Sequence, residues 1–163
     1  VAALNAYLDR MTRIILSLNG TVDKYIGDAI MAFWNAPIAQ PEHARLAVSA
    51  ALKMVEELEA MKISSEGCTF DMGVGINTGE MMVGNMGSQF IYDYTVIGDN
   101  VNLASRVEGL TRKYPYRVII TEATYGEIKD YFEIEYLDEV SVKGKDKRIK
   151  IYGVKESKNL KLL

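Results

Sequence analysis

Residues 21–34 of this 163-residue chain read TVDKYIGDAIMAFW. Two runs rich in apolar residues, Thr21–Ile26 and Ala29–Trp34, are separated only by Gly27 and Asp28. That spacing is typical of a β-hairpin with a two-residue turn. The flanks are apolar enough to bury one face of the hairpin, so its turn is the end of a rigid element. The stretch therefore predicts a hairpin with the Asp28 carboxylate at its turn and Lys24 on the strand before it.

The rest of the chain alternates helical and strand-like patterns. Before the hairpin, apolar residues recur at three- and four-residue steps through residues 1–18, which predicts an amphipathic helix ended by Asn19-Gly20. After it we expect a helix from Pro41 to about Lys62, and then strands on either side of Thr78-Gly79. These two strands are 70–77 and 81–85. The remaining predicted elements are a helix capped by Asp99 or Asn100 and ending near Thr111, strand 118–121, helix 122–129, and a hairpin of 132–142 with 148–154.

This order predicts an α+β fold, a ferredoxin-like (βαββαβ-type) sandwich with added strands. We expect one domain over residues 1–155, followed by a Lys-containing C-terminal tail over residues 156–163.

Composition narrows the class of protein. The chain is 48% hydrophobic and 25% charged, as is usual for a globular domain, and its net charge of −3 gives no general attraction for nucleic acid. Cys68 is alone, which fits a reducing compartment, and no apolar run approaches the ~18 residues of a membrane span. We therefore expect a cytoplasmic domain without a membrane segment of its own, whose parent protein can still be membrane-anchored.

A second informative stretch, residues 95–106, reads TVIGDNVNLASR. Asn102 and Arg106 are four residues apart, so on a helix they project from one face. The helix begins beside Gly98, and the amides of its first turn are available to an anion. Taken alone, the pair would be interpreted as an ordinary surface Asn and Arg.

Taken together, the two stretches resemble the active site of the class III nucleotidyl cyclases, through the hairpin Gly-Asp and the pattern Asn-x-x-Ser-Arg after Ile-Gly-Asp. The resemblance implies that Asp28 is one of two metal-binding aspartates. It also implies that Asn102 orients the ribose and that Arg106 stabilises charge on the phosphate in flight. In the pattern Val-Lys-Gly-Lys, Lys143 is implied to reach the terminal phosphates.

The base is indicated by Lys24 and Thr95. An ammonium only donates, so Lys24 matches the lone pair of adenine N1 and not the N–H of guanine N1. The family places Lys here in ATP-specific members and typically Glu in guanylyl members. Thr95 stands where many members have Asp, and its hydroxyl can accept from the adenine amino group. The structural alternatives are a solvated edge-strand lysine and a β-branched strand residue, and Asp23 is expected to be solvated.

The implied activity is that of an adenylate cyclase, which converts ATP to 3′,5′-cyclic AMP and pyrophosphate with two Mg²⁺ or Mn²⁺ ions. In the family, Asp28-type ligands come from one subunit and the remaining groups from the other, so a homodimer through the catalytic face is expected. Regulatory domains are expected in the parent protein.

One departure from the family is evident. The family's first strand, Phe-x-Asp-Ile-x-Gly-Phe-Thr, supplies the other metal aspartate, and nothing between Val1 and Asp28 matches it. We therefore expect a cyclase fold lacking its first strand, with little or no activity in this chain by itself. The alternatives are a non-catalytic nucleotide-binding or dimerisation module, a guanylate cyclase and, more distantly, a nucleic-acid module.

Overall fold

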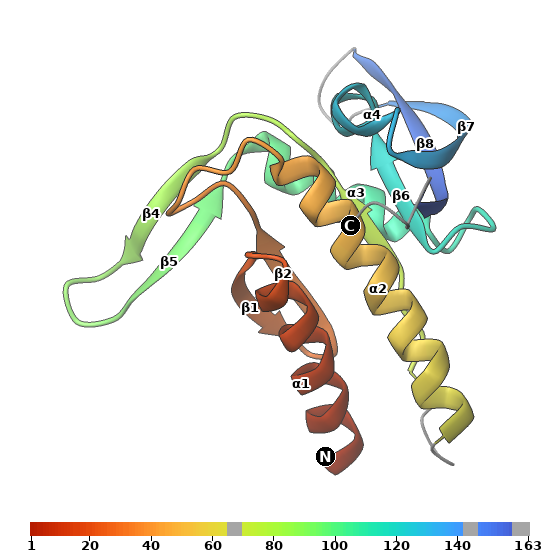
Figure 1. Cartoon of the computed structure of the whole chain (residues 1–163). Coiled ribbons are helices and arrows are strands. Elements are labelled where there is room, and N and C mark those ends of the chain that lie inside the picture. The colour runs from red at the N-terminus through yellow and green to blue at the C-terminus, as the bar shows by residue number, and fades with distance from the viewer. Residues whose placement is uncertain (65–69, 142–146, 158–163) are drawn as a thin grey trace. The chain divides into compact units, whose positions relative to one another are not determined.

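A computed structural model describes residues 1–64, 70–141 and 147–157. The chain divides into two compact units, which are described separately. The first contains Val1–Met72 and Met82–Val96; the second contains Gly73–Met81 and the described residues from Ile97 onward. The mixed α+β architecture confirms the predicted fold class (Figure 1). No helix in the described part of the chain has the length and apolar character needed to cross a bilayer.

The first unit is built on two helices, α1 (Ala2–Ser17) and α2 (His43–Ser64), which pack against each other (Figure 1). Their contact buries Met11 and Leu58 completely. At the rim of this core, Arg10 Nη1 lies 2.7 Å from Glu57 Oε1. Both helices agree with the predicted ones to within two residues at each end, because the apolar spacing of each sequence defines the face that is buried.

The predicted hairpin is formed by β1 (Thr21–Ile26) and β2 (Ala29–Phe33). Its strands pair up to Ile26 and Ala29, which leaves Gly27 and Asp28 as the turn, and Gly27 has a φ of 63°. The register shifts at Asp23, because Val22 is opposite Ala32 while Lys24 is opposite Met31. One residue of β1 is therefore unpaired and the strand contains a β-bulge.

A second hairpin in this unit corrects the prediction for residues 70–97. The strand Met81–Asn85 is observed as β4 (Met82–Gly87), but its partner is β5 (Tyr92–Ile97), which the sequence analysis did not identify. The predicted strand 70–77 shortens to β3 (Val74–Ile76). Phe70 stacks on Tyr7 with ring centroids 5.1 Å apart, so the residues before β3 pack on the helical core and do not extend a strand.

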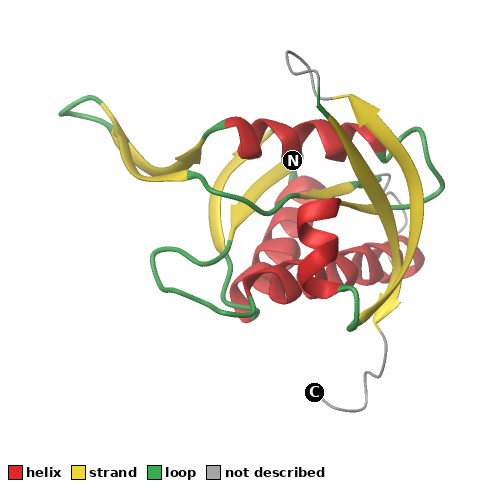
Figure 2. Ribbon diagram, turned by 90° about the horizontal axis from the view of Figure 1, so that it is seen from above, coloured by secondary structure: helices red, strands yellow, loops and turns green. Residues whose placement is uncertain are grey.

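The second unit contains a four-stranded sheet in the order β3-β6-β8-β7. Figure 2 draws the strands of the chain in yellow and the helices in red. β6 (Val118–Thr121) is buried at every position and runs parallel to β3. β8 (Arg148–Ser157) is antiparallel to both β6 and β7 (Phe132–Ser141), which confirms the predicted terminal hairpin. The short helix α4 (Glu122–Ile128) follows β6 directly.

The helix α3 (Asp99–Leu110) packs closely on β3. The expected cap at Asp99 or Asn100 is wrong: the N-cap is Gly98, with a φ of 138°. The Asn100 side chain instead donates to the Glu80 carbonyl at 2.9 Å and accepts from Asn77 Nδ2 at 3.1 Å. The Asn100 amide is therefore bonded to residues 77 and 80 and makes no capping hydrogen bond to α3.

We expect Gly75→Ala to destabilise the chain by about 1–3 kcal/mol. An added Cβ would overlap the backbone of Glu108 and lie 2.7 Å from the Ala104 carbonyl oxygen, so α3 would have to move away from β3. The measurement is the free energy of unfolding from urea titrations followed by circular dichroism.

The matched control is Gly126→Ala in α4, where an added Cβ meets nothing within 4 Å. Alanine is the better helix former, so this variant should be as stable as the parent or up to about 1 kcal/mol more stable. Equal unfolding free energies for Gly75→Ala and the parent would contradict the close packing of α3 on β3.

Candidate active site

Asp28 lies at the β1–β2 turn, as predicted, and is exposed. The tight turn and the paired strands behind it give the carboxylate a defined position. Among the described residues its side chain has no hydrogen bond or ion pair. An exposed carboxylate on a rigid turn can therefore act as an oxygen ligand for a cation held jointly with a phosphate.

Asp23 is not solvated, contrary to the prediction from sequence. None of its side chain is exposed. Its Oδ2 accepts a short hydrogen bond from the Thr95 hydroxyl and a longer one, at 3.4 Å, from the Val96 N–H. The prediction was wrong because it took no account of the bulge in β1, which turns the Asp23 side chain inward. In a regular strand, the alternation of the neighbouring residues would decide which face Asp23 lies on.

Lys24 and Thr95 lie on either side of this carboxylate. Lys24 Nζ is 3.6 Å from Asp23 Oδ1, and the Lys24 side chain remains 46% exposed. Thr95 is only 6% exposed. The structure thus brings together the two residues predicted to bind the base. They lie around Asp23, which was expected to be solvated.

Asn102 and Arg106 belong to the second unit, on α3. Both are exposed, while Val107 is completely buried and Leu103 is partly buried against the same core, so Asn102 and Arg106 lie on an exposed face of α3. Within the described part of the chain, neither the Asn102 amide nor the Arg106 guanidinium has a polar partner. Four residues apart on one helix, they can contact a single ligand, the amide as donor and acceptor and the guanidinium as a fork of donors.

Lys143 lies outside the described residues, so its predicted contact with phosphate stays a prediction. Among the residues that are described, no group of three or more His, Cys, Asp or Glu side chains gathers to hold a metal ion. Asp28 offers one carboxylate, which fits a metal that takes its other ligands from a phosphate chain and a further carboxylate. A self-contained metal centre is not formed by the described residues.

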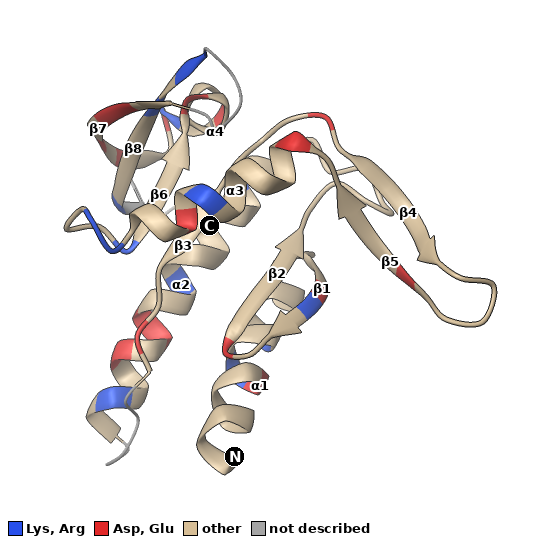
Figure 3. Cartoon of the chain, turned by 180° about the vertical axis from the view of Figure 1, so that it is seen from behind, with Lys and Arg blue, Asp and Glu red and all other residues tan. Residues whose placement is uncertain are grey.

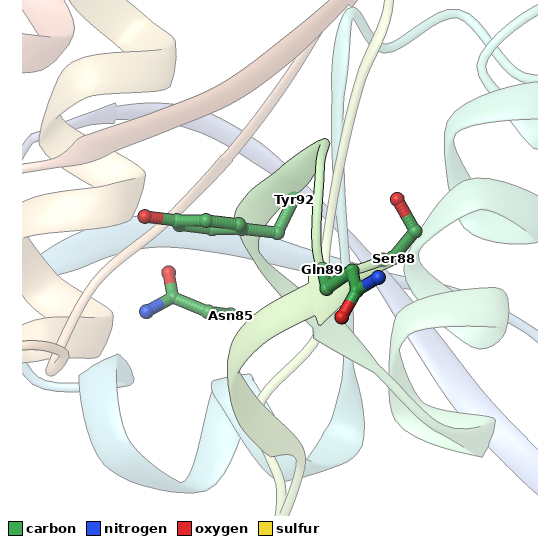
Figure 4. A pocket seen from close by; sticks show the side chains of 5 residues that line it. Asn85, Ser88, Gln89 and Tyr92 are labelled. Carbon is green, nitrogen blue, oxygen red and sulfur yellow. The ribbon is translucent and has the colours of Figure 1, made fainter.

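A shallow depression is present on the β4–β5 hairpin, and it contains none of the predicted site residues. Asn85, Gly87, Ser88, Gln89 and Tyr92 line it. Figure 4 shows the Tyr92 and Asn85 side chains extending in one direction, with Ser88 and Gln89 across the ribbon. The same hairpin exposes large apolar side chains, namely Met82 (67%), Phe90 (84%), Ile91 (76%) and Tyr92 (61%). Its only charged residue is Asp93 (Figure 3).

Comparison with known proteins identifies the family. The family described as adenylate and guanylate cyclase catalytic domain matches residues 1–156. The terminal-differentiation-specific adenylate cyclase of Dictyostelium discoideum is 42% identical over 156 residues, which cover 93% of this chain and 7% of that protein. The chain spans between 7% and 31% of three curated adenylate cyclases that it matches.

Solved structures of similar proteins support the same family. The adenylyl cyclase CyaB from P. aeruginosa is 35% identical, with a TM-score of 0.86 over 96% of this chain and 82% of that one. The guanylyl cyclase Cya2 is 29% identical, with a TM-score of 0.88 over 100% of this chain and 83% of that one. Since both an adenylyl and a guanylyl enzyme share the fold, the fold by itself does not fix the base. The chain belongs to the adenylate and guanylate cyclase catalytic domains, the class III nucleotidyl cyclases.

Proposed function

We propose that this domain is an adenylate cyclase that converts ATP to 3′,5′-cyclic AMP and pyrophosphate. The observation that carries the choice of ATP is the grouping of Lys24 and Thr95 around Asp23. A lysine ammonium donates and cannot accept, which suits adenine N1, and a hydroxyl oxygen beside it can accept from the adenine amino group. Guanine presents an N–H in place of the adenine N1 lone pair, so the contact with the Lys24 ammonium would be mismatched.

The reaction is an in-line displacement within one nucleotide. The ribose 3′-oxygen loses its proton and attacks the α-phosphorus, the bond to the bridging oxygen breaks, and pyrophosphate leaves. Lys24 and Thr95 hold the base, and Asn102 orients the ribose so that the 3′-oxygen is in line. Arg106 donates to the phosphate oxygens as charge builds up, an interaction of a kind worth roughly 3–4 kcal/mol of barrier. Lys143 is proposed to bind the departing phosphates.

Divalent cations, Mg²⁺ or Mn²⁺, are the proposed cofactors, and Asp28 is the residue of this chain that would hold them. Two such ions lower the pKa of the attacking hydroxyl and neutralise the triphosphate when bound. The exposed, unpaired carboxylate at the hairpin turn supports this role for Asp28.

A homodimer is proposed as the active assembly. The β4–β5 hairpin exposes several large apolar side chains, and exposed apolar surface of this kind commonly marks an interface. With a two-fold axis, Asp28 of one copy and the Asn102–Arg106 face of the other can form two equivalent sites. We propose that the domain works in the cytoplasm as the output module of a longer, regulated protein.

A guanylate cyclase is the second candidate, because the fold is shared with one. Lys24 argues against it. A module that binds nucleotide without turnover is the third, and the exposed pair Asn102 and Arg106 argues against it, since both groups are free among the described residues to act on a phosphate.

The test of the proposal is the intact protein that carries this chain, assayed with Mn²⁺ or Mg²⁺ and either ATP or GTP. We expect cyclic AMP from ATP, with a much lower rate of cyclic GMP formation. Binding of ATP with no cyclic product would favour the non-catalytic module, and a preference for GTP would favour a guanylate cyclase.

Lys24→Met in that protein should lower kcat/KM for ATP by about 10- to 100-fold, the loss of one hydrogen bond from a charged donor. Methionine keeps the length of the side chain and removes the ammonium. The control is Lys53→Met on the exposed face of α2, which should leave the kinetics unchanged. Equal kinetics for both variants would show that Lys24 is an ordinary strand residue.

Mixing two inactive variants tests the shared site. Asp28→Asn and Arg106→Ala should each abolish activity, because every site of either homodimer lacks one group. After the subunits exchange, half of the dimers are mixed and each has one complete site, so about one quarter of the wild-type activity should return.

Arg112→Ala is the control for this experiment, since Arg112 is an exposed arginine in the turn after α3 and pairs with Glu108 at 3.6 Å. It should be active alone. Failure of the mixed sample to regain activity, although exchange is demonstrated by tagged subunits, would contradict a site built from two copies.

A further inference from the structure

The Asp23 carboxylate is buried in an unusual place. It occupies the bulge of β1, immediately before Lys24, and its side chain has no exposed surface. Oδ2 accepts from Thr95 and Val96, whereas Oδ1 has no hydrogen bond in the described structure and faces the Lys24 ammonium at 3.6 Å. Burying a carboxylate with an oxygen that accepts no hydrogen bond costs free energy of folding. If this residue served only to join two hairpins, an uncharged side chain would be expected in its place.

The hydrogen bond from Thr95 decides what that hydroxyl can offer to a ligand. A threonine hydroxyl has one proton and two lone pairs, so by itself it can donate to a guanine carbonyl as readily as it accepts from an adenine amino group. A carboxylate has no proton to give when it is ionised, so the Thr95 proton is directed to Asp23. The Thr95 oxygen is then left as an acceptor only. Burial of Thr95 keeps water from competing for this bond.

The second carboxylate oxygen of Asp23, Oδ1, restricts the position of the Lys24 ammonium. An ammonium on a flexible four-carbon chain has many positions, and the ion pair with Oδ1 restricts them. The side chain keeps 46% of its surface exposed, so it can still contact a ligand. One carboxylate thus sets the hydrogen-bond polarity of Thr95 and the position of Lys24.

We propose that Asp23 is a specificity-determining positioning residue, which makes Thr95 an obligate acceptor and aligns Lys24 so that the site accepts adenine and rejects guanine. This inference rests on the proposed cyclase function and deepens it. Asp23 does not touch the nucleotide itself; it acts through the two residues that do.

The test is Asp23→Asn in the intact protein, with kcat/KM measured for ATP and GTP on the same preparation. With its oxygen toward Thr95, the new amide places a nitrogen donor beside the Lys24 ammonium and the ion pair is lost. With its nitrogen toward Thr95, the hydroxyl proton is freed to donate to guanine. In either orientation we expect the ATP:GTP ratio to fall about tenfold or more.

The ratio is independent of how much protein is folded, because both substrates report on the same active molecules. Should Asp23→Asn fold too poorly to assay, Asp23→Leu replaces the buried charge by an apolar side chain that is larger but has the same branching at Cγ, and the same fall is expected. The control is Asp9→Asn, which changes an exposed carboxylate that pairs with Arg13 at 3.0 Å on α1; its ratio should equal that of the wild type.

Lower activity with an unchanged ATP:GTP ratio in both Asp23 variants would show that Asp23 only anchors the hairpin, and the inference would be overturned while the proposed cyclase function stood. Absence of any cyclic nucleotide from the wild-type protein would overturn the proposed function itself. The two failures are therefore distinguished by the wild-type assay.

Discussion

Two consecutive residues of β5, Thr95 and Val96, donate hydrogen bonds to the same carboxylate oxygen of Asp23. Asp23 can accept both because the bulge in β1 turns its side chain into the first unit and away from solvent. This contact joins two hairpins that are distant in sequence, and it places Lys24 and Thr95 on opposite sides of one negative charge. The proposed recognition of adenine depends on it, since neither residue has a fixed hydrogen-bond geometry of its own.

The catalytic half of the proposed site depends on backbone packing. Asn102 and Arg106 are directed outward because Val107 is buried beneath them, and α3 approaches β3 closely only because residue 75 is glycine. The first turn of α3 is tied by the Asn100 amide to residues 77 and 80, which precede it in the chain. No residue that the structure describes makes a polar side-chain contact with either group, which leaves both available for a ligand.

The sequence predicted those parts of the molecule in which local pattern and tertiary structure agree. The hairpin turn at Gly27-Asp28 and the helices α1 to α4 follow from apolar spacing and turn chemistry. It did not predict the burial of Asp23, because a bulge shifts the register by one residue without a local signal. The sequence did not predict β5, because Asp93 interrupts the apolar run there. It also did not predict the N-cap at Gly98, because the usual preference for Asp or Asn as the N-cap was outweighed by hydrogen bonds between Asn100 and residues 77 and 80.

The most direct measurement is a crystal structure of the intact protein with a non-hydrolysable ATP analogue and Mn²⁺. We expect the Asp28 carboxylate of one subunit and the Asn102–Arg106 pair of the other on the same nucleotide. Thr95 Oγ1 should lie within hydrogen-bond distance of the adenine amino group while its bond to Asp23 is retained. A nucleotide contacted by only one of these two groups, or an adenine ring distant from Lys24 and Thr95, would contradict the proposed site.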